Sequence, residues 1–577
     1  MSESKQVVTF TILIDGTAIP GSVQVTGVVV NREANRISTA KVMLLDGDAA
    51  AQDFPLSSGD LFVPGKELEI QVGYESDEAS IFKGVITQQS IKIREGGPAS
   101  LSVMCRDKAW VMTRGEHNRY FFEVTDADVL EELISGAGLS ADISDTDSVD
   151  HPVLVQYQST DWDFVVNRAE VNGSLVFTED GTVRIATPDL GQGPVETVLQ
   201  YGENLLAFDA EIDGRSQYEA VTGTSWDPAN QEPVETEGSA PSENKHGNLD
   251  SGKLAGDLGV PDIALHHDGQ VAETELTAWT SAKLLKSRLT RMRGTAKAQG
   301  SAEFLPDTVV TIQGLGDRYN GDAYLTGVQH EIMDGNWLTT VQFGMDEAWF
   351  SEQINRGSRG ASGLLPPISG LQIGVVTQLE GDPDGEDRIL VTMPMISPEE
   401  EGVWSRLATL DAGDSRGWVF RPEIGDEVIL GFLNDDPRNA VVLGQVHSSA
   451  KPAPIPGSDD NHEKGLTTRD GMTVLFDDDK LDMTLATPGG NSVALSEDQG
   501  GIFLEDENGN KVTLNSDGIT LESAKDIILS APQGDVKIEG INVEVAAQAN
   551  FKAEGSAGAE VSTSAVAVLK GSLVQIN

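Results

Sequence analysis

Between Gly465 and Asn577 the chain repeats a short unit, which reads Asp526-Ile-Ile-Leu-Ser, Asp535-Val-Lys-Ile-Glu-Gly and Asn550-Phe-Lys-Ala-Glu-Gly in three of its copies. Apolar and polar residues alternate inside each unit, which is the period of a β-strand. One apolar anchor per unit recurs roughly every eight residues along this segment. These anchors are the predicted core of a needle: Ile519, Ile527, Val536, Val543, Phe551, Val561 and Val568, with Val574 closing the series.

A short strand with one apolar face cannot bury that face alone. The repeats must therefore stack along the chain, pair between chains, or do both. This predicts a long β-prism over residues 465–577. An ordinary sandwich or barrel is the alternative for period-two segments at this spacing. The small side chains and the scarcity of aromatic residues after Phe503 count against that alternative, because they leave little apolar volume for a separate core.

Length and charge restrict the remaining possibilities. A chain of 577 residues is expected to hold about three or four domains. Its net charge of −52 disfavours nucleic-acid binding, because phosphate backbones attract Lys and Arg, and it disfavours anionic membrane surfaces for the same reason. The one cysteine, Cys105, lies in an alternating run and is predicted to be a core residue.

The first 354 residues are predicted to form two β-barrels around an α/β insertion. Strand patterns from Val7 to Ile14 and from Val23 to Val30 indicate a first barrel over residues 1–105. Helical spacing follows Thr125, a predicted N-cap, and recurs at Asp161, which indicates an α/β insertion over residues 106–204.

The strand pattern resumes at Leu205 and predicts a second barrel over residues 205–354. The segment between Asp227 and His267 is rich in Pro, Gly, Ser, Asn and acidic residues and is predicted to be a long loop. A helix is expected from about Thr274 to Arg293. A Gly-, Ser- and Pro-containing linker is expected at 355–367.

The next block predicts five strands within about 80 residues, which fits a small OB-fold barrel over residues 368–447. Its segments read Gly374-Val-Val, Arg388-Ile-Leu-Val-Thr-Met-Pro, and Asn434-Asp-Asp-Pro-Arg-Asn-Ala-Val-Val-Leu-Gly-Gln-Val. A second linker at 448–464 leads into the needle. The fold class expected for the whole chain is therefore mainly β.

At these residues the chain resembles the central spike proteins of contractile injection machines. The barrel carries Gly-Val-x(6)-Asp-Pro-Asp-x-x-x-Arg, then Pro-Glu-x-Gly-Asp-Glu-Val, then Pro-x-x-x-Val-Val-Leu-Gly, between Gly374 and Gly444. Further matches are Phe82-x-Gly, Gln156-Tyr-x-x-x-Asp-Trp-Asp-Phe and Gly321-x-x-Tyr-Leu-Thr-x-Val-x-His330. The family includes the VgrG spikes of type VI secretion, the hub and spike of contractile phages, and the fused spikes of extracellular contractile injection systems such as the antifeeding prophage.

The resemblance implies a homotrimer with two tube-like barrels per chain, which would form a six-fold-like ring meeting the hexameric inner tube and the baseplate. It implies a C-terminal trimeric β-helix or β-prism needle over residues 465–577 that punctures a target membrane and carries a small PAAR-type tip protein. The expected docking residues for that tip protein are Leu573, Val574, Gln575, Ile576 and Asn577. No cofactor and no nucleic-acid partner are implied.

No catalytic or metal-binding residue is predicted. Acid groups such as Glu399 and Glu400, or the run that begins at Asp477, are interpreted as solvated rather than as paired glycosidase carboxylates. The pair His266-His267 is placed in a loop and lacks metal-ligand spacing. Asp506-Glu-Asn-Gly-Asn lacks the ligand order of an EF-hand and is predicted to be a hairpin turn.

Two other function classes agree less well with the sequence. A trimeric adhesin would need a signal peptide, whereas the sequence starts without a basic segment followed by an apolar run. A cell-wall hydrolase would need an inserted domain, and only about 20 residues separate the barrel from the needle. We therefore expect a non-enzymatic structural spike, assembled in the bacterial cytoplasm and working in a phage tail-like particle that is released outside the cell.

Overall fold

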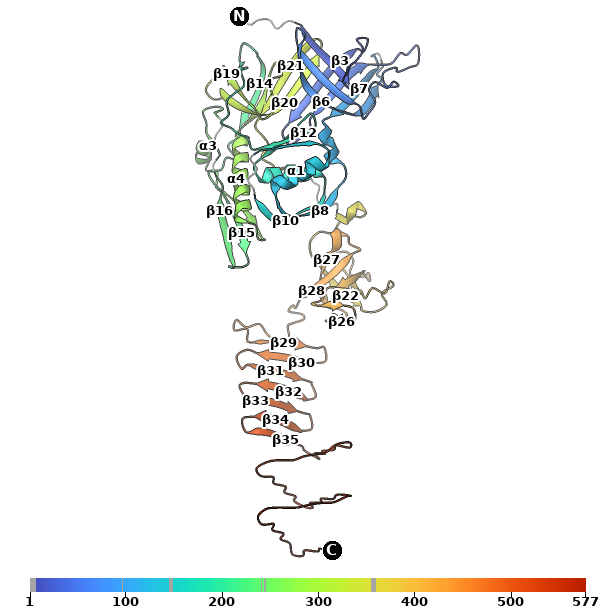
Figure 1. The fold of residues 1–577 in the computed structure, drawn as a ribbon, viewed down its shortest axis with the longest axis vertical. Coiled ribbons are helices and arrows are strands. Elements are labelled where there is room, and N and C mark those ends of the chain that lie inside the picture. Colours follow the sequence, from blue (N-terminus) through green and yellow to red (C-terminus); the bar gives the residue numbers. More distant parts are fainter. Residues whose placement is uncertain are drawn as a thin grey trace. The chain divides into compact units, whose positions relative to one another are not determined.

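The computed structural model of the chain describes residues 7–95, 97–144, 149–239, 241–242, 245–353 and 360–576 (Figure 1). The chain divides into two compact units, Met1–Pro367 and Ile368–Asn577. The predicted linker at 355–367 lies partly outside the described residues, as does the segment before Val7. None of the helices within the described ranges is long and apolar enough to cross a membrane.

The first unit is built on one 13-stranded sheet. The main path of this sheet runs β14-β18-β21-β20-β3-β4-β7-β6-β5-β1-β2, and β19 joins β20 to β13 beside it. The strands from the N-terminal part are β1 (Val8–Ile14), β2 (Thr17–Ala18), β3 (Val25–Glu33), β4 (Thr39–Leu45), β5 (Glu67–Tyr74), β6 (Asp77–Lys92) and β7 (Ser100–Arg106). The later strands are β13 (Leu199–Gln200), β14 (Leu205–Ile212), β18 (Met292–Gln299), β19 (Val309–Gln313), β20 (Gly321–Met333) and β21 (Asn336–Phe343).

The two regions predicted as barrels are joined in this sheet. Strands β3 and β20 pair antiparallel, from Glu33 opposite Gly327 to Gly27 opposite Met333. This pairing gives each strand a partner on an edge that would otherwise present free backbone groups. The prediction of a mainly β chain is confirmed, and the two halves share a sheet that the sequence pattern did not reveal.

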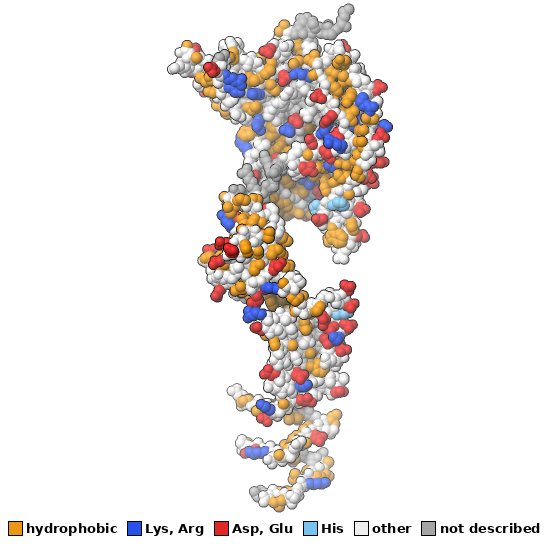
Figure 2. Space-filling model, turned by 180° about the vertical axis from the view of Figure 1, so that it is seen from behind, with side chains coloured by type: hydrophobic (Ala, Val, Ile, Leu, Met, Phe, Trp, Pro, Cys, Tyr) orange, Lys and Arg blue, Asp and Glu red, His pale blue; other side chains and the backbone are white. Residues whose placement is uncertain are grey.

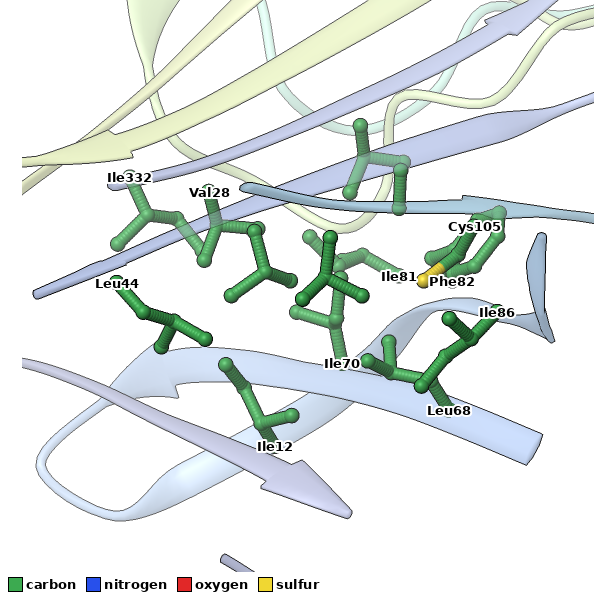
Figure 3. Close-up of a cluster of buried hydrophobic side chains, with 14 of the residues drawn as sticks. Ile12, Val28, Leu44, Leu68, Ile70, Ile81, Phe82, Ile86, Cys105 and Ile332 are labelled. Carbon is green, nitrogen blue, oxygen red and sulfur yellow. The ribbon is translucent and has the colours of Figure 1, made fainter. Parts of the chain in front are cut away.

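A buried apolar cluster lies between the strands of the N-terminal half (Figure 3). Alternate residues of β1, β3, β4, β5 and β7 point into it, and Ile332 and Trp337 enter it from β20 and β21. Cys105 is fully buried among them, and this burial raises the pKa of its thiol to about 12. The predicted core role of Cys105 is confirmed.

The α/β insertion packs two helices against short strands. Helix α1 (Asp126–Gly136) begins after Thr125, which caps it as predicted, and α2 (Asp161–Val171) begins after Thr160. The apolar faces of both helices form one cluster with Met112, Val176 and Ile185. The other elements of the insertion are η1 (Lys108–Thr113), β8 (His117–Thr125), β9 (Ser140–Ile143), β10 (Asp150–Ser159), β11 (Leu175–Glu179) and β12 (Thr182–Ala186).

The segment between Asp227 and His267 is not the long loop that its composition predicted. It contains β16 (Glu232–Glu237), α3 (Ser251–Leu258) and β17 (Ile263–His267), and both strands pair with β15 (Val221–Asp227). His266 and His267 therefore lie in a strand. The polar composition misled the prediction because this small sheet is covered by the helix that follows it in the chain, α4 (Glu273–Thr290), which contacts β15 and β16. A Cβ at Gly223 in β15 would lie 2.6 Å from Thr280 Cγ2, so this contact is close.

The second unit opens with a closed five-stranded barrel in the order β22-β23-β24-β28-β27, as predicted for the OB-fold region. Its core includes Val376, Val391, Val428, Leu430 and Val442. The strands are β22 (Gln372–Gln378), β23 (Ile389–Thr392), β24 (Val403–Leu407), β27 (Glu427–Phe432) and β28 (Ala440–Gln445), and a small hairpin of β25 (Ala412–Gly413) and β26 (Arg416–Gly417) lies between β24 and β27. The short helical turns α5 (Phe350–Gln353) and η2 (Gly360–Gly363) lie at the end of the first unit, and η3 (Leu433–Asp435) lies between β27 and β28.

Candidate interaction face of the C-terminal sheet

Seven short strands follow the barrel and form a single antiparallel sheet (Figure 1). Each strand pairs with the next one along the chain, so the sheet is a simple meander. The strands are β29 (Glu463–Thr467), β30 (Thr473–Asp477), β31 (Asp482–Ala486), β32 (Ser492–Ser496), β33 (Gly501–Glu505), β34 (Lys511–Asn515) and β35 (Gly518–Glu522).

The register of these strands aligns their apolar residues in two columns. Residues two apart in a strand lie on the same face, and directly paired residues lie side by side across strands. The first column is Leu466, Val474, Leu485, Val493, Leu504, Val512 and Leu521. The second column is Phe476, Met483, Leu495, Ile502, Leu514 and Ile519, with Lys464 at its start. We call these two columns the apolar face.

The opposite face of the same sheet has a different composition. Its central column reads Gly465, Leu475, Thr484, Ala494, Phe503, Thr513 and Thr520. Small and hydroxyl-bearing residues dominate this column, and Asp, Glu, Ser and Asn occupy many of the flanking positions. The sheet therefore has one face suited to burial and one suited to water.

The apolar face is uncovered within one chain. None of its apolar residues is buried, and Leu521 and Ile519 at its end are more than half exposed. An open hollow with a cavity volume of about 880 Å³ follows the first column across all seven strands. Contiguous apolar surface of this kind marks an interaction site in soluble proteins.

Hydrogen-bonded polar side chains lie at both ends of the apolar face. At the start, the Lys464 ammonium group donates to the carbonyl of Asn461 at 2.6 Å and pairs with Asp478. At the other end, the Asn510 side-chain oxygen accepts hydrogen bonds from Ser523 Oγ at 2.7 Å and from the Ala524 amide at 3.2 Å. These bonds fix the point at which the chain leaves the sheet.

The chain beyond Ser523 forms no strand within the described residues up to Ile576. The repeats from Asp526 onwards were predicted to be short strands, and the single chain does not pair them with one another. Their alternation gives each unit an apolar side, but no other described segment of the chain forms a sheet with them. Of the two modes of pairing left open by the sequence, stacking along the chain is seen in β29 to β35 only.

The predicted needle anchors are all exposed in the single chain. Exposed fractions range from 51% at Val574 to 93% at Val561, and Phe551 is 69% exposed. The predicted tip residues Leu573, Val574, Gln575 and Ile576 are exposed as well, and Asn577 lies outside the described residues. Only Ile519 belongs to the apolar face. The predicted anchors include no other member of either column, because the eight-residue spacing that defines them begins at Ile519.

The polar motifs in this region have local roles. Asp506 Oδ1 accepts from the amides of Asn508 at 2.9 Å and Asn510 at 2.8 Å, which holds the predicted hairpin turn between β33 and β34. Asp477 pairs with Lys480 at 2.6 Å, and this contact lowers the pKa of the Asp477 carboxyl. Among the described residues, no group of His, Cys, Asp and Glu has the arrangement of a metal site.

Matches to known protein families fall on the same segments as the barrel and the C-terminal sheet and repeats described above. Residues 372–447 match the type VI secretion system/phage-baseplate injector OB domain, and residues 482–577 match the phage baseplate V C-terminal trimerisation domain. A barrel of this kind followed by a trimerisation domain defines a VgrG-like spike protein. Residues 4–334, more than half of the chain, match the Alg8 N-terminal domain. The chain therefore belongs to the family of the Alg8 N-terminal domain.

Individual relatives are distant. The type VI secretion system spike protein VgrG1b of Pseudomonas aeruginosa is 22% identical over 440 residues, which span 70% of this chain and 57% of the relative. VgrG3 of Vibrio cholerae is 31% identical over 96 residues, or 15% of this chain and 9% of the relative. The chain thus covers little more than half the length of the first of these proteins, and much less of the second.

Two solved structures are among those similar to this chain. The 43 kDa tail protein of prophage MuSo2 from Shewanella oneidensis gives a TM-score of 0.45 at 13% identity, covering 59% of this chain and 99% of that one. The Escherichia coli c3393 protein, described as a component of the type VI secretion system, gives a TM-score of 0.38 at 14% identity, covering 75% and 99%.

Proposed function

We propose that this protein is the trimeric spike of a contractile injection machine, with a mechanical and non-catalytic role. The observation that carries the proposal is the apolar face, which one chain leaves open to water over seven strands. Three copies that turn this face towards a common axis would bury it. Burial of a Val, Leu, Ile, Phe or Met side chain contributes about 1.5–3 kcal/mol relative to its exposed state.

The repeats beyond Ser523 extend the same arrangement. With no partner in their own chain, the units that carry Ile527, Val536, Val543, Phe551, Val561 and Val568 would pair with the equivalent units of two other copies. Such pairing leaves no free strand edge along the needle and links every unit to two neighbours. A needle held in this way resists buckling and unravelling when it is driven into an envelope.

The remaining parts take roles that the family resemblance suggests. The β-rich first unit would form the ring that meets the hexameric inner tube and the baseplate. The segment Leu573 to Asn577 would dock a PAAR-type tip protein. The apolar side chains of Leu573, Val574 and Ile576 support this assignment, because they are exposed in the single chain.

The proposal is tested with a matched pair of variants in strand β35. Leu521 lies on the apolar face and its neighbour Thr520 lies on the opposite face. Leu521→Asp places three carboxylates in the shared interior and should convert the trimer to monomers of 61.4 kDa, whereas Thr520→Asp should leave the trimer intact. Light scattering on the full chain gives the answer. A wild-type protein that is a stable monomer would contradict the proposal.

A further inference from the structure

Strands β8 and β10 of the α/β insertion form a two-stranded antiparallel ribbon with an apolar outer face. Tyr120 and Phe122 in β8 lie opposite Val155 and Val153 in β10, and Tyr157 continues the row on the same face. All five side chains are exposed, from 46% at Val153 to 70% at Tyr120, and we call them the ribbon patch. In Figure 1 the ribbon lies at the end of the insertion that points away from the 13-stranded sheet.

The inner face of the ribbon fixes the patch in position. Phe121 is buried in the apolar cluster formed by the two helices of the insertion. Both strands also bind Asp161 at the start of α2, because Arg119 pairs with it at 3.2 Å and the Gln156 amide nitrogen donates to it at 2.9 Å. A two-stranded ribbon is at best marginally stable on its own, so these contacts are what hold it. The rings of Tyr120 and Phe122 stack with their centres 5.9 Å apart on this fixed support.

The ribbon also has room for a further strand. In the described part of the chain its sheet contains β8 and β10 alone, so the outer edge of each strand has no strand beside it. Such an edge presents backbone N–H and C=O groups that can pair with an extended segment of another protein. Alternate side chains of an added strand would then lie beside the alternate side chains of the ribbon patch.

The charges around the ribbon indicate what kind of segment fits. Exposed carboxylates flank the strands at Glu116, Glu123 and Asp150, whereas Arg119, the arginine of β8, is already paired with Asp161. The chain as a whole carries a net charge of −52, and acidic side chains are spread over the face of the molecule seen in Figure 2. A segment that places Lys or Arg beside its apolar residues would complement this surface.

A second copy of this chain does not meet these requirements. Contact between the same patch on two copies is a two-fold contact, which the proposed three-fold assembly does not contain. It would also bring together the carboxylates of Glu123 and Asp150 from both copies, and like charges placed side by side in a sheet are destabilising. The charge and the symmetry therefore favour a different protein.

We propose that the ribbon patch binds an extended segment of a separate protein, which joins the ribbon as a third strand. This segment carries apolar side chains at alternate positions and Lys or Arg near its ends. The site adds a docking function to the α/β insertion and needs no contact between copies of this chain.

A synthetic peptide tests the site on the full chain. The probe has nine residues, the length of β8, with Val and Tyr at alternate positions, Thr between them, Lys at both ends and a fluorescent label. Fluorescence anisotropy should show saturable binding that Phe122→Ser or Tyr157→Ser weakens about ten-fold, because exposed aromatic side chains dominate such contacts. Trp226→Ser is the matched control, since it removes an exposed aromatic side chain from another small sheet. Absence of saturable binding, or equal affinity in all of these proteins, would overturn the proposal.

A second peptide with Glu in place of both Lys residues tests the charge requirement. It should bind more weakly than the Lys peptide at low salt, and the difference should disappear at about 1 M salt, where charges are screened within a few ångströms. Equal binding of the two peptides at low salt would overturn the inference of a basic partner.

Hydrogen exchange and light scattering identify the occupied surface. The Lys peptide should slow amide exchange within residues 117–125 or 150–159, and protection confined to other segments would overturn the site. Phe122→Ser should have the same mass in solution as the wild type. A lower mass would show that the patch joins copies of this chain and would overturn the separate partner, whereas a wild-type monomer that still binds the peptide would contradict the proposed trimer alone.

Discussion

His246 is held neutral by its surroundings in the first unit. The ring is buried, its Nε2 lies 3.0 Å from the Tyr319 carbonyl oxygen, and it meets Phe343 edge-on at 5.1 Å. Burial disfavours the charged form and lowers the pKa of His246 to about 4, and the positive charge of Arg291 acts in the same direction. A second buried histidine, His330, has its pKa lowered to about 3 by burial.

The lowered pKa of His246 predicts that the first unit loses stability in acid. The pKa of His246 is lower in the folded protein than the value of 6.5 in the unfolded chain, so the unfolded state binds a proton first as the pH falls. The contribution of the neutral His246 ring to the free energy of unfolding is therefore fully present above pH 6.5 and is lost as the pH falls towards 4. The loss from His246 is about 3 kcal/mol. His246→Asn should therefore lose less stability than the wild type between pH 7 and pH 4 in urea unfolding. His266→Asn, which removes an exposed histidine, is the control, and a parallel loss in all three proteins would contradict the prediction.

At the scale of single elements, α1 shows how local sequence places a helix. Thr125 Oγ1 accepts from the Asp128 amide at 3.2 Å, and Asp128 Oδ2 accepts from the Thr125 amide at 3.0 Å. These two bonds satisfy backbone donors that the first turn leaves free.

Thr125→Ala should destabilise the helix by about 1 kcal/mol. Faster amide exchange over residues 126–136 would report this loss. Glu131→Ala, on the exposed side of the same helix, should leave the exchange rates unchanged, and equal effects would show that the cap is unimportant.

At the scale of the whole molecule, the proposed trimer brings three copies of residues 573–577 together. Each copy adds the exposed side chains of Leu573, Val574 and Ile576, so the assembled end would present an apolar platform. Deletion of these five residues should abolish capture of a PAAR-type tip protein while the particle keeps its trimeric mass. The readouts are a pull-down and light scattering on one preparation, with Ser572→Ala as the matched control. Capture at undiminished affinity would place the docking surface elsewhere.

Much of this architecture could be read from residues close together in the chain. The N-cap at Thr125, the closed barrel over Gly374 to Gly444 and the core position of Cys105 follow from patterns with periods of two to four residues. The same alternation identified the C-terminal repeats as units that one chain cannot bury. Such signals are local, because apolar residues recur at a fixed spacing along one side of a strand or helix, whatever packs against that side.

Pairings between distant segments were decided by the tertiary structure. Strand β3 meets β20 some 300 residues later in the chain, β17 completes a small sheet with β15 under α4, and Leu466 aligns with Val474, Leu485 and the rest of the first column. The partner of a strand depends on turn geometry and on which apolar surfaces remain uncovered when the chain collapses. The sequence by itself determined which residues of each strand lie on its apolar side. The fold determined the register that gathers them into one face, because a shift of a single residue would turn that face to the other side of the sheet.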